Sequence, residues 1–205
     1  MDENTALNHV VEPEKKKRSF KEAVIFNFYD FASVMSAAVI TIMLIFTFAF
    51  RFVGVVGTSM LPTLQHKDWL VISEMSRDVK YGDIIISTQP NAFNEPVVKR
   101  VIATEGQTVD INFSKGEVFV DGTLLNEPYI NNPTTNESDV SFPLTVPEGC
   151  IFVMGDNRQF SSDSRSSSIG FIDEDYVLGV VKYRIIEQKE NGTAGFVPFS
   201  EWKVH

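Results

Sequence analysis

A nucleophilic serine or cysteine needs a base to remove its proton, and histidine is the usual one. The chain has three histidines: His9, His66 in a polar QHKD turn, and His205. Only His66 lies in the body of the main domain, so a Ser-His-Asp triad would depend on a turn residue. The single cysteine, Cys150, stands in the apolar run CIFVM, which is more typical of a small core side chain than of a reactive thiolate. Histidine-dependent catalysis is therefore disfavoured.

Lysine is the other base available, but its ordinary pKa of about 10.4 keeps it protonated at neutral pH. Burial away from water can lower that pKa by ~2 to 3 units. Lys99 stands out because four apolar residues surround it: Val97, Val98, Val101 and Ile102. Strand alternation places Val97, Lys99 and Val101 on one face. Such a lysine is either a charged residue that protects the edge of a sheet or a desolvated base.

Ser59 is the candidate nucleophile, in the segment GTSMLPTL at residues 57–64. Gly57 permits close approach of the backbone, and Pro62 stiffens the chain just after the serine. Three other segments follow in order: KDWLVI at 67–72, KRVIA at 99–103 and GDNRQFSSDSR at 155–165. After a single N-terminal apolar run, these four segments resemble the motifs of type I signal peptidases, and the GTSM form resembles the compact Gram-positive members.

The resemblance implies a Ser-Lys dyad in which Ser59 is the nucleophile and Lys99 the general base. It also implies that Ser161 orients the lysine amine. Asp163 and Arg165 match a carboxylate and a guanidinium that form a structural ion pair in the wall of the site. No histidine is needed, in agreement with the few histidines of the chain.

The same resemblance concerns the oxyanion and the substrate. The backbone N–H of Ser59 would donate to the oxyanion of the tetrahedral intermediate. Some members carry a serine two positions earlier, where this chain has Gly57, so the second donor is left open between Thr58 and water. Shallow pockets for small side chains are expected at five family-matched positions: Val55, Gly57, Met60, Leu64 and Val98. The implied activity is removal of signal peptides after small-x-small sites by a membrane-bound serine endopeptidase.

An uncharged apolar run over residues 31–50 precedes these motifs. At ~1.5 Å per residue it spans about 30 Å, the thickness of the hydrocarbon core of a bilayer. It predicts an uncleaved transmembrane helix, because the apolar core of a cleaved signal peptide has only about 7 to 15 residues and ends in a small-x-small site. Five basic residues precede it: Lys15, Lys16, Lys17, Arg18 and Lys21. The positive-inside rule therefore predicts a single-pass protein of the cell membrane with a cytoplasmic tail over 1–30 and an extracytoplasmic catalytic domain over 51–205.

Short β-branched and aromatic runs recur in the outer part of the chain, between turn signals. They begin at residues 69, 83, 96, 108, 117, 150 and 176. This pattern predicts a mainly β, antiparallel catalytic domain behind the one N-terminal helix. Asp121-Gly122 is a typical two-residue hairpin turn. Residues 131–148 are polar and rich in proline, and indicate a long exposed loop or a small insertion.

Composition limits the partners. The 205 residues suffice for one compact domain with an appendage, and 43% apolar residues exclude a disordered chain. A net charge of -9, from 27 acidic and 18 basic residues, argues against nucleic acid as a partner. One cysteine is too few for a cysteine-based metal motif. We expect preproteins and the lipid bilayer as partners, and no metal or organic cofactor.

Three other functions stay open. A self-cleaving Ser-Lys peptidase of the repressor type has a similar dyad, and Ala194-Gly195 could mimic its cleavage site. A membrane-tethered, non-enzymatic β module that binds a partner would need neither Ser59 nor an activated lysine. A sortase-like transpeptidase using Cys150 ranks last, because that cysteine falls in a predicted core strand.

Overall fold

The computed structural model describes residues 20–73, 78–187 and 194–198. The basic residues at 15–18, and also His9 and His205, lie outside these ranges. Contacts between Cα atoms divide the chain into an N-terminal unit that ends at Leu44 and an outer unit that begins at Ile45.

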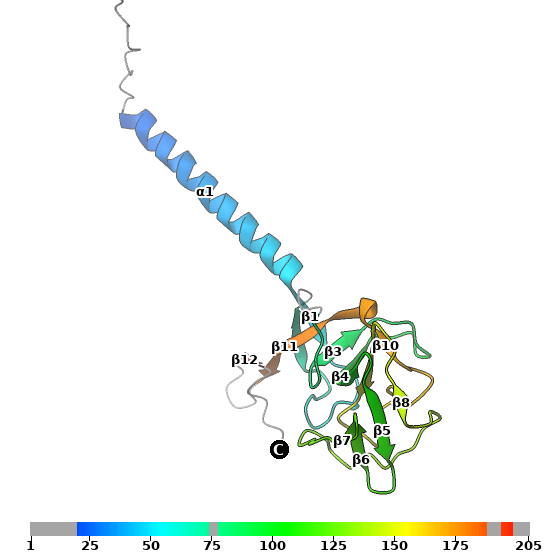
Figure 1. Ribbon diagram of the computed structural model, residues 1–205. Coiled ribbons are helices and arrows are strands. Elements are labelled where there is room, and N and C mark those ends of the chain that lie inside the picture. The colour runs from blue at the N-terminus through cyan, green and yellow to red at the C-terminus, as the bar shows by residue number, and fades with distance from the viewer. Residues whose placement is uncertain (1–19, 74–77, 188–193, 199–205) are drawn as a thin grey trace, which may run out of the picture. The chain divides into compact units, whose positions relative to one another are not determined.

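The N-terminal unit is built on the helix α1, Phe20–Ala49 (Figure 1). Its stretch Asn27–Leu44 is long and apolar enough to cross a membrane, by length and composition. The helix begins before the apolar run at 31–50, because charged residues such as Asp30 interrupt hydrophobicity without breaking a helix. Phe50 belongs instead to the first strand of the outer unit.

The outer unit contains a large antiparallel sheet in the order β1-β2-β11-β3-β4-β9-β10, with β12 paired to β11. Its strands are β1 (Phe50–Gly54), β2 (Trp69–Ser73), β3 (Ile84–Ser87), β4 (Val97–Thr104), β9 (Cys150–Met154), β10 (Ile172–Asp173), β11 (Val177–Glu187) and β12 (Ala194–Pro198). A short 3-10 helix, Glu174–Tyr176, precedes β11. The prediction of a mainly β, antiparallel domain is confirmed, and each of the seven predicted runs forms a strand.

A second, smaller sheet has the order β7-β6-β5-β8 (Figure 1). Its strands are β5 (Thr108–Asn112), β6 (Glu117–Val120), β7 (Thr123–Leu124) and β8 (Leu144–Thr145). The predicted hairpin turn joins β6 to β7, and both Asp121 and Gly122 have the positive φ that a primed turn requires.

The segment 131–148 packs on this sheet and is not simply an exposed loop. It supplies β8, which pairs with β5, and its residues Thr134 and Val146 are buried. A polar, proline-rich sequence predicted exposure, but Val146 packs into the core and β8 pairs with β5. The short strands β7, β8 and β10 give no periodic signal, because two residues cannot show an alternation.

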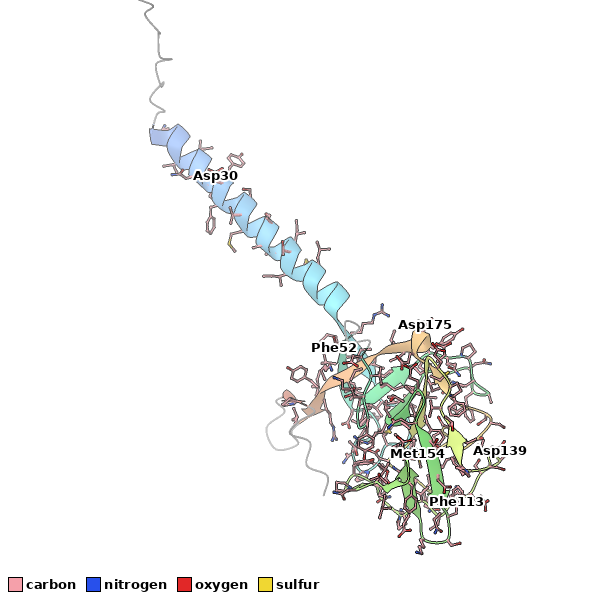
Figure 2. The ribbon with its side chains drawn as sticks, viewed as in Figure 1. Asp30, Phe52, Phe113, Asp139, Met154 and Asp175 are labelled. Carbon is pink, nitrogen blue, oxygen red and sulfur yellow. The ribbon has the colours of Figure 1, made fainter. Side chains whose placement is uncertain are left out.

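Side chains from both sheets fill the interior of the outer unit, with Met154 fully buried within it (Figure 2). One core lies between the second sheet and the strands β4 and β9. Four aromatic rings continue it in edge-to-face contacts: Phe113, Phe142, Phe152 and Phe171. Another core holds Val55, Met60 and Leu64 against β2, β3 and β11. This second core fixes the backbone that carries Ser59.

Candidate active site

Ser59 and Lys99 meet although 40 positions separate them. Lys99 Nζ donates a hydrogen bond to Ser59 Oγ at 3.0 Å and another to the carbonyl oxygen of Val98 at 3.1 Å. Ser59 is half-buried, and only 4% of Lys99 is exposed. A hydroxyl and an amine are thus held within proton-transfer distance in a largely dry site.

Burial lowers the pKa of Lys99 below its ordinary value, because removing water disfavours the ammonium. The carboxylates of Asp163 and Asp156 oppose this shift, and the guanidinium of Arg165 adds to it. The side chain of Lys99 is not a solvated charge that protects the edge of a sheet, since it is buried and bonded to Ser59. Of the two interpretations of the sequence, the structure therefore favours the desolvated base.

The turn that carries Ser59 is fixed from both sides. Met60 and Leu64 anchor it in the core. Asn157 clamps it from the other side: its backbone N–H donates to the carbonyl of Ser59 at 2.9 Å, and its Nδ2 donates to the carbonyl of Thr58 at 3.0 Å. Gly57, just before this turn, has φ of +97°, a conformation that other residues rarely adopt.

Gly155 allows the GDNRQFSSDSR segment to approach this turn. A Cβ atom at position 155 would lie 2.2 Å from Ser161 Oγ and 2.5 Å from the carbonyl oxygen of Ser59. Both distances are far below van der Waals contact, so only glycine fits here. The hydroxyl of Ser161 therefore lies against the backbone of Gly155, close to the serine turn.

Ser161 is near the dyad but does not bond to Lys99 in this structure. Its Oγ is buried without a hydrogen bond of normal geometry, and it interacts with the carboxylate of Asp163, whose pKa it helps to lower. The amine bonds instead to Ser59 and to the carbonyl of Val98. The orienting role of Ser161 stays a prediction.

Asp163 and Arg165 form a buried ion pair, as the resemblance implied. Arg165 Nε and Nη2 donate to the two carboxylate oxygens at 2.8 and 2.9 Å, and the N–H of Gly155 donates to Asp163 Oδ2 at 2.9 Å. Burial alone would raise the pKa of Asp163, but the pairing with Arg165 and the N–H of Gly155 together hold this pKa below its usual range. The pair fixes the loop that contains Ser161.

Replacing Asp163 with alanine is expected to lower the free energy of unfolding by about 3 to 5 kcal/mol, because it leaves the buried charge of Arg165 without its partner. The midpoint of urea unfolding measures this. Since the folded pKa of Asp163 lies below the unfolded value of about 3.9, the pair's contribution is present above that pH and is lost as the pH falls through the folded pKa. Asp78→Ala is the control, because Asp78 and Lys80 form an exposed pair. Equal midpoints for the two variants would contradict the buried pair.

Two further buried ion pairs surround the site, and sequence reasoning gave neither a role. Arg100, next to Lys99, donates to both carboxylate oxygens of Asp156 at 2.8 and 2.7 Å, and Thr63 also donates to Asp156. Arg158, fully buried, pairs with Glu127 at 2.6 Å. Arg100, Asp156 and Arg158 all stand inside the motif segments, and only Glu127 does not. Charged residues within these motifs were therefore the signal from which the buried pairs could have been predicted.

A cleft of about 430 Å³ opens beside the dyad. Ser59 and Lys99 line it, together with four of the five positions expected to contact substrate: Val55, Gly57, Met60 and Val98. Leu64 is not among the lining residues; it is fully buried in the core. Neighbouring residues of a motif can point in opposite directions. The spacing of a motif alone therefore does not show which of its side chains line a pocket and which are buried in the core. The lining also includes Phe93, Glu95 and Pro96, which the sequence analysis did not single out.

The other nucleophile and base candidates, Cys150 and His66, make no hydrogen bond to Ser59 or Lys99 among the described contacts. Cys150 is a free, half-buried cysteine at the start of β9, packed on the core, and burial raises the pKa of its thiol. His66 is exposed, and its Nδ1 accepts a long hydrogen bond of 3.4 Å from the N–H of Gly57. Among the described residues, no group of three or more His, Cys, Asp or Glu side chains could hold a metal ion.

An antiparallel β domain with a serine and a buried lysine, behind an apolar helix, defines the class of membrane-anchored serine endopeptidases. Residues 28–186 match the family model described as "Signal peptidase, peptidase S26". The chain belongs to this family and is a serine endopeptidase that removes signal peptides. The resemblance inferred from the four motifs is confirmed.

Two relatives are similar to this protein over most of the chain. The protein is 37% identical over 153 residues to "Probable signal peptidase I-1" of Synechocystis sp., covering 68% of this chain and 74% of the relative. It is 33% identical over 177 residues to "Signal peptidase I P" of Bacillus subtilis subsp. natto, covering 82% and 90%. A solved signal peptidase I from Enterococcus faecalis is 34% identical, with a TM-score of 0.41, and the match covers 49% of this chain and 94% of that one.

Proposed function

We propose that Ser59 is the nucleophile and Lys99 the general base of this signal peptidase. The observation that carries the proposal is the 3.0 Å hydrogen bond between Ser59 Oγ and an amine that is almost entirely buried. Burial lowers the pKa of Lys99, so its neutral amine forms more readily than that of an exposed lysine. A neutral amine has a lone pair that can accept the serine proton.

The reaction then follows in two stages. Ser59 Oγ attacks the carbonyl carbon of the scissile bond while its proton passes to Lys99 Nζ, and the resulting ammonium protonates the leaving amino group as the peptide C–N bond breaks. In the second stage Lys99 takes a proton from water, whose oxygen attacks the acyl ester, and returns it to Ser59 Oγ as the ester bond breaks. Asp163 and Asp156 stabilise the ammonium in each stage, because both carboxylates favour the charged form of the amine.

The oxyanion is stabilised by the backbone N–H of Ser59. Asn157 supports this role, since its two hydrogen bonds hold the carbonyls of Thr58 and Ser59 and thereby the orientation of the turn. Loss of one oxyanion donor typically lowers the rate by about 10²- to 10³-fold. Gly57 has no side chain to add a second donor, so Thr58 and water are the two candidates for it.

The substrate binds as an extended peptide with small residues at the first and third positions before the cut. The pairing of β4 with β9 begins at Arg100, so Val97, Val98 and Lys99 pair only with β3 among the described strands. This leaves a stretch of strand edge beside the cleft where a peptide can add by backbone hydrogen bonds. The shallow apolar walls formed by Val55 and Met60 suit alanine or glycine side chains.

The helix α1 is the anchor of this enzyme in the cell membrane. The N-terminal tail lies in the cytoplasm and the domain from residue 51 onward lies outside, because basic residues concentrate before the apolar segment. Preproteins present their cleavage sites at the outer surface of the same membrane. Tethering therefore raises the effective concentration of enzyme at the substrate without any new contact.

The test is incubation of the detergent-solubilised full chain with a preprotein, followed by mass analysis of the products. We expect one cut after a small-x-small site, and loss of cleavage when the residue before the cut is made bulky. Cleavage elsewhere, or cleavage insensitive to that change, would contradict the proposal. A non-enzymatic binding module would leave the preprotein intact.

A self-cleaving peptidase is disfavoured by the position of its expected site. Ala194 and Gly195 lie in β12, paired with Glu187 and Ile186 of β11. A peptide bond held in a sheet is not available to a cleft elsewhere on the domain. The purified chain alone should stay unclipped between Ala194 and Gly195.

A further inference from the structure

One rim of the cleft is a preorganised loop that precedes β4. Asn91 holds it with three side-chain hydrogen bonds: Nδ2 donates to the carbonyls of Gln89 and Glu95 at 3.1 and 2.8 Å, and Oδ1 accepts from the N–H of Phe93 at 2.9 Å. The N–H of Asn94 also donates to the carbonyl of Asn91 at 3.1 Å. The loop therefore presents its side chains from a fixed backbone, which lowers the entropy cost of binding.

Phe93 and Glu95 are the side chains that this loop presents to the cleft. Both line it together with Ser59 and Lys99. Phe93 is 52% exposed, an unusual state for a large aromatic ring on a pinned loop. Glu95 is exposed, supplies the one carboxylate among the lining residues, and forms no ion pair with a described residue.

The order of the lining residues along the chain indicates which part of a substrate meets this rim. Two runs of lining residues form walls of the cleft: residues 53–57 precede Ser59, and residues 93 and 95–98 precede Lys99. A signal peptidase places the residues before the cut in its pockets, so the peptide runs in the same direction as these walls. Glu95 and Phe93 precede Lys99 by four and six positions. Residues 91–96 form a loop with turns and β4 begins only at Val97, so we assign the rim to the part of the substrate upstream of the third residue before the cut.

We propose that Phe93 and Glu95 are specificity-determining residues that select the substrate segment upstream of the third residue before the cut. This rests on the proposed function, which defines the cut. Phe93 favours a large apolar side chain in that segment, and Glu95 favours a basic side chain over an acidic one. The proposal concerns the part of the signal peptide beyond the two small residues.

The apolar preference is tested with two peptides that share one small-x-small site. The long peptide extends about eight residues before the cut and carries leucine opposite the rim; the short one begins at the third residue before the cut. In the full-length enzyme, Phe93→Ala should lower kcat/KM for the long peptide about five- to twenty-fold and leave the short peptide unchanged. Leu124→Ala, a similarly exposed apolar residue on the second sheet, should change neither.

The charge preference is tested by exchange. Long peptides with lysine or glutamate at the fourth or fifth position before the cut are compared on the wild type and on Glu95→Lys. The wild type should favour the lysine peptide about two- to five-fold at low salt, and Glu95→Lys should reverse this preference. A merely structural role of Glu95 would slow both peptides alike and would not reverse the order.

The outcomes separate this proposal from the proposed function. Suppose that every variant cleaves the short peptide, and that Phe93→Ala and Glu95→Lys cleave all long peptides with the kcat/KM of the wild type. The rim then has no role in substrate selection, and the inference is overturned. If the wild type cleaves neither peptide at the small-x-small site, the proposed function itself fails.

Discussion

Ser59→Ala should lower kcat/KM for a preprotein by on the order of 10⁵- to 10⁶-fold, because no other described hydroxyl is bonded to the amine of Lys99. The fold should be retained, since the half-buried side chain of Ser59 makes this one side-chain contact and Met60 and Leu64 still anchor the turn. The measurement is the initial rate of cleavage with each purified full-length variant, beside the urea unfolding midpoint. Ser114→Ala is the control, because Ser114 is exposed and lies on the turn between β5 and β6.

If Ser59→Ala retained a rate within tenfold of the wild type, Ser59 would not be the nucleophile. The unfolding midpoint shows whether the variant loses activity because the nucleophile is missing or because the domain is unfolded. The hydrogen-bonded turn around Thr58 predicts that the midpoint does not move.

Lys99→Met and Lys99→Arg should each lower kcat/KM by a similar factor, on the order of 10⁴-fold or more, for different reasons. Methionine fills the same apolar space without a basic atom. Arginine keeps a donor and a positive charge, but its pKa stays above about 12, so it cannot accept the serine proton. The pair of variants therefore separates the need for a base from the need for a charge.

Lys115→Met is the matched control, because Lys115 is exposed and lies on the turn between β5 and β6. Substantial activity in Lys99→Arg would mean that Lys99 contributes charge or packing, and the general base would have to be sought elsewhere. Stability should rise or stay equal in Lys99→Met, because a buried amine is replaced by an apolar side chain.

The strands were predictable because their signals are local. Alternation in TVDIN and EVFV, and the Asp121-Gly122 turn between β6 and β7, are visible in a few neighbouring residues. The start of α1 at Phe20 was not predictable, because the apolar run marks only the membrane segment and the helix begins before it. The strand β1 was hidden for a similar reason, as Phe50 continues the apolar run.

The choice between an edge lysine and a buried base at Lys99 depends on long-range pairing. The burial of Lys99 and its contact with Ser59, 40 positions away in the chain, decide it, and no local pattern reports that contact. The same holds for Leu64, which belongs to the core, and for Phe93, which reaches the cleft through a loop held by Asn91. The motif segments identified Ser59 and Lys99, whereas the roles of Arg100, Asn157 and Phe93 depend on tertiary neighbours and were missed.

Direct titration of Lys99 tests the central claim, a dry amine that can take a proton from Ser59. In full-length enzyme with 13C-labelled lysine, NMR should show one resonance whose midpoint lies well below about 10.4, and this resonance should be missing in Lys99→Met. If every lysine resonance titrates near the ordinary value and none below it disappears in that variant, the buried-base account of this peptidase is wrong.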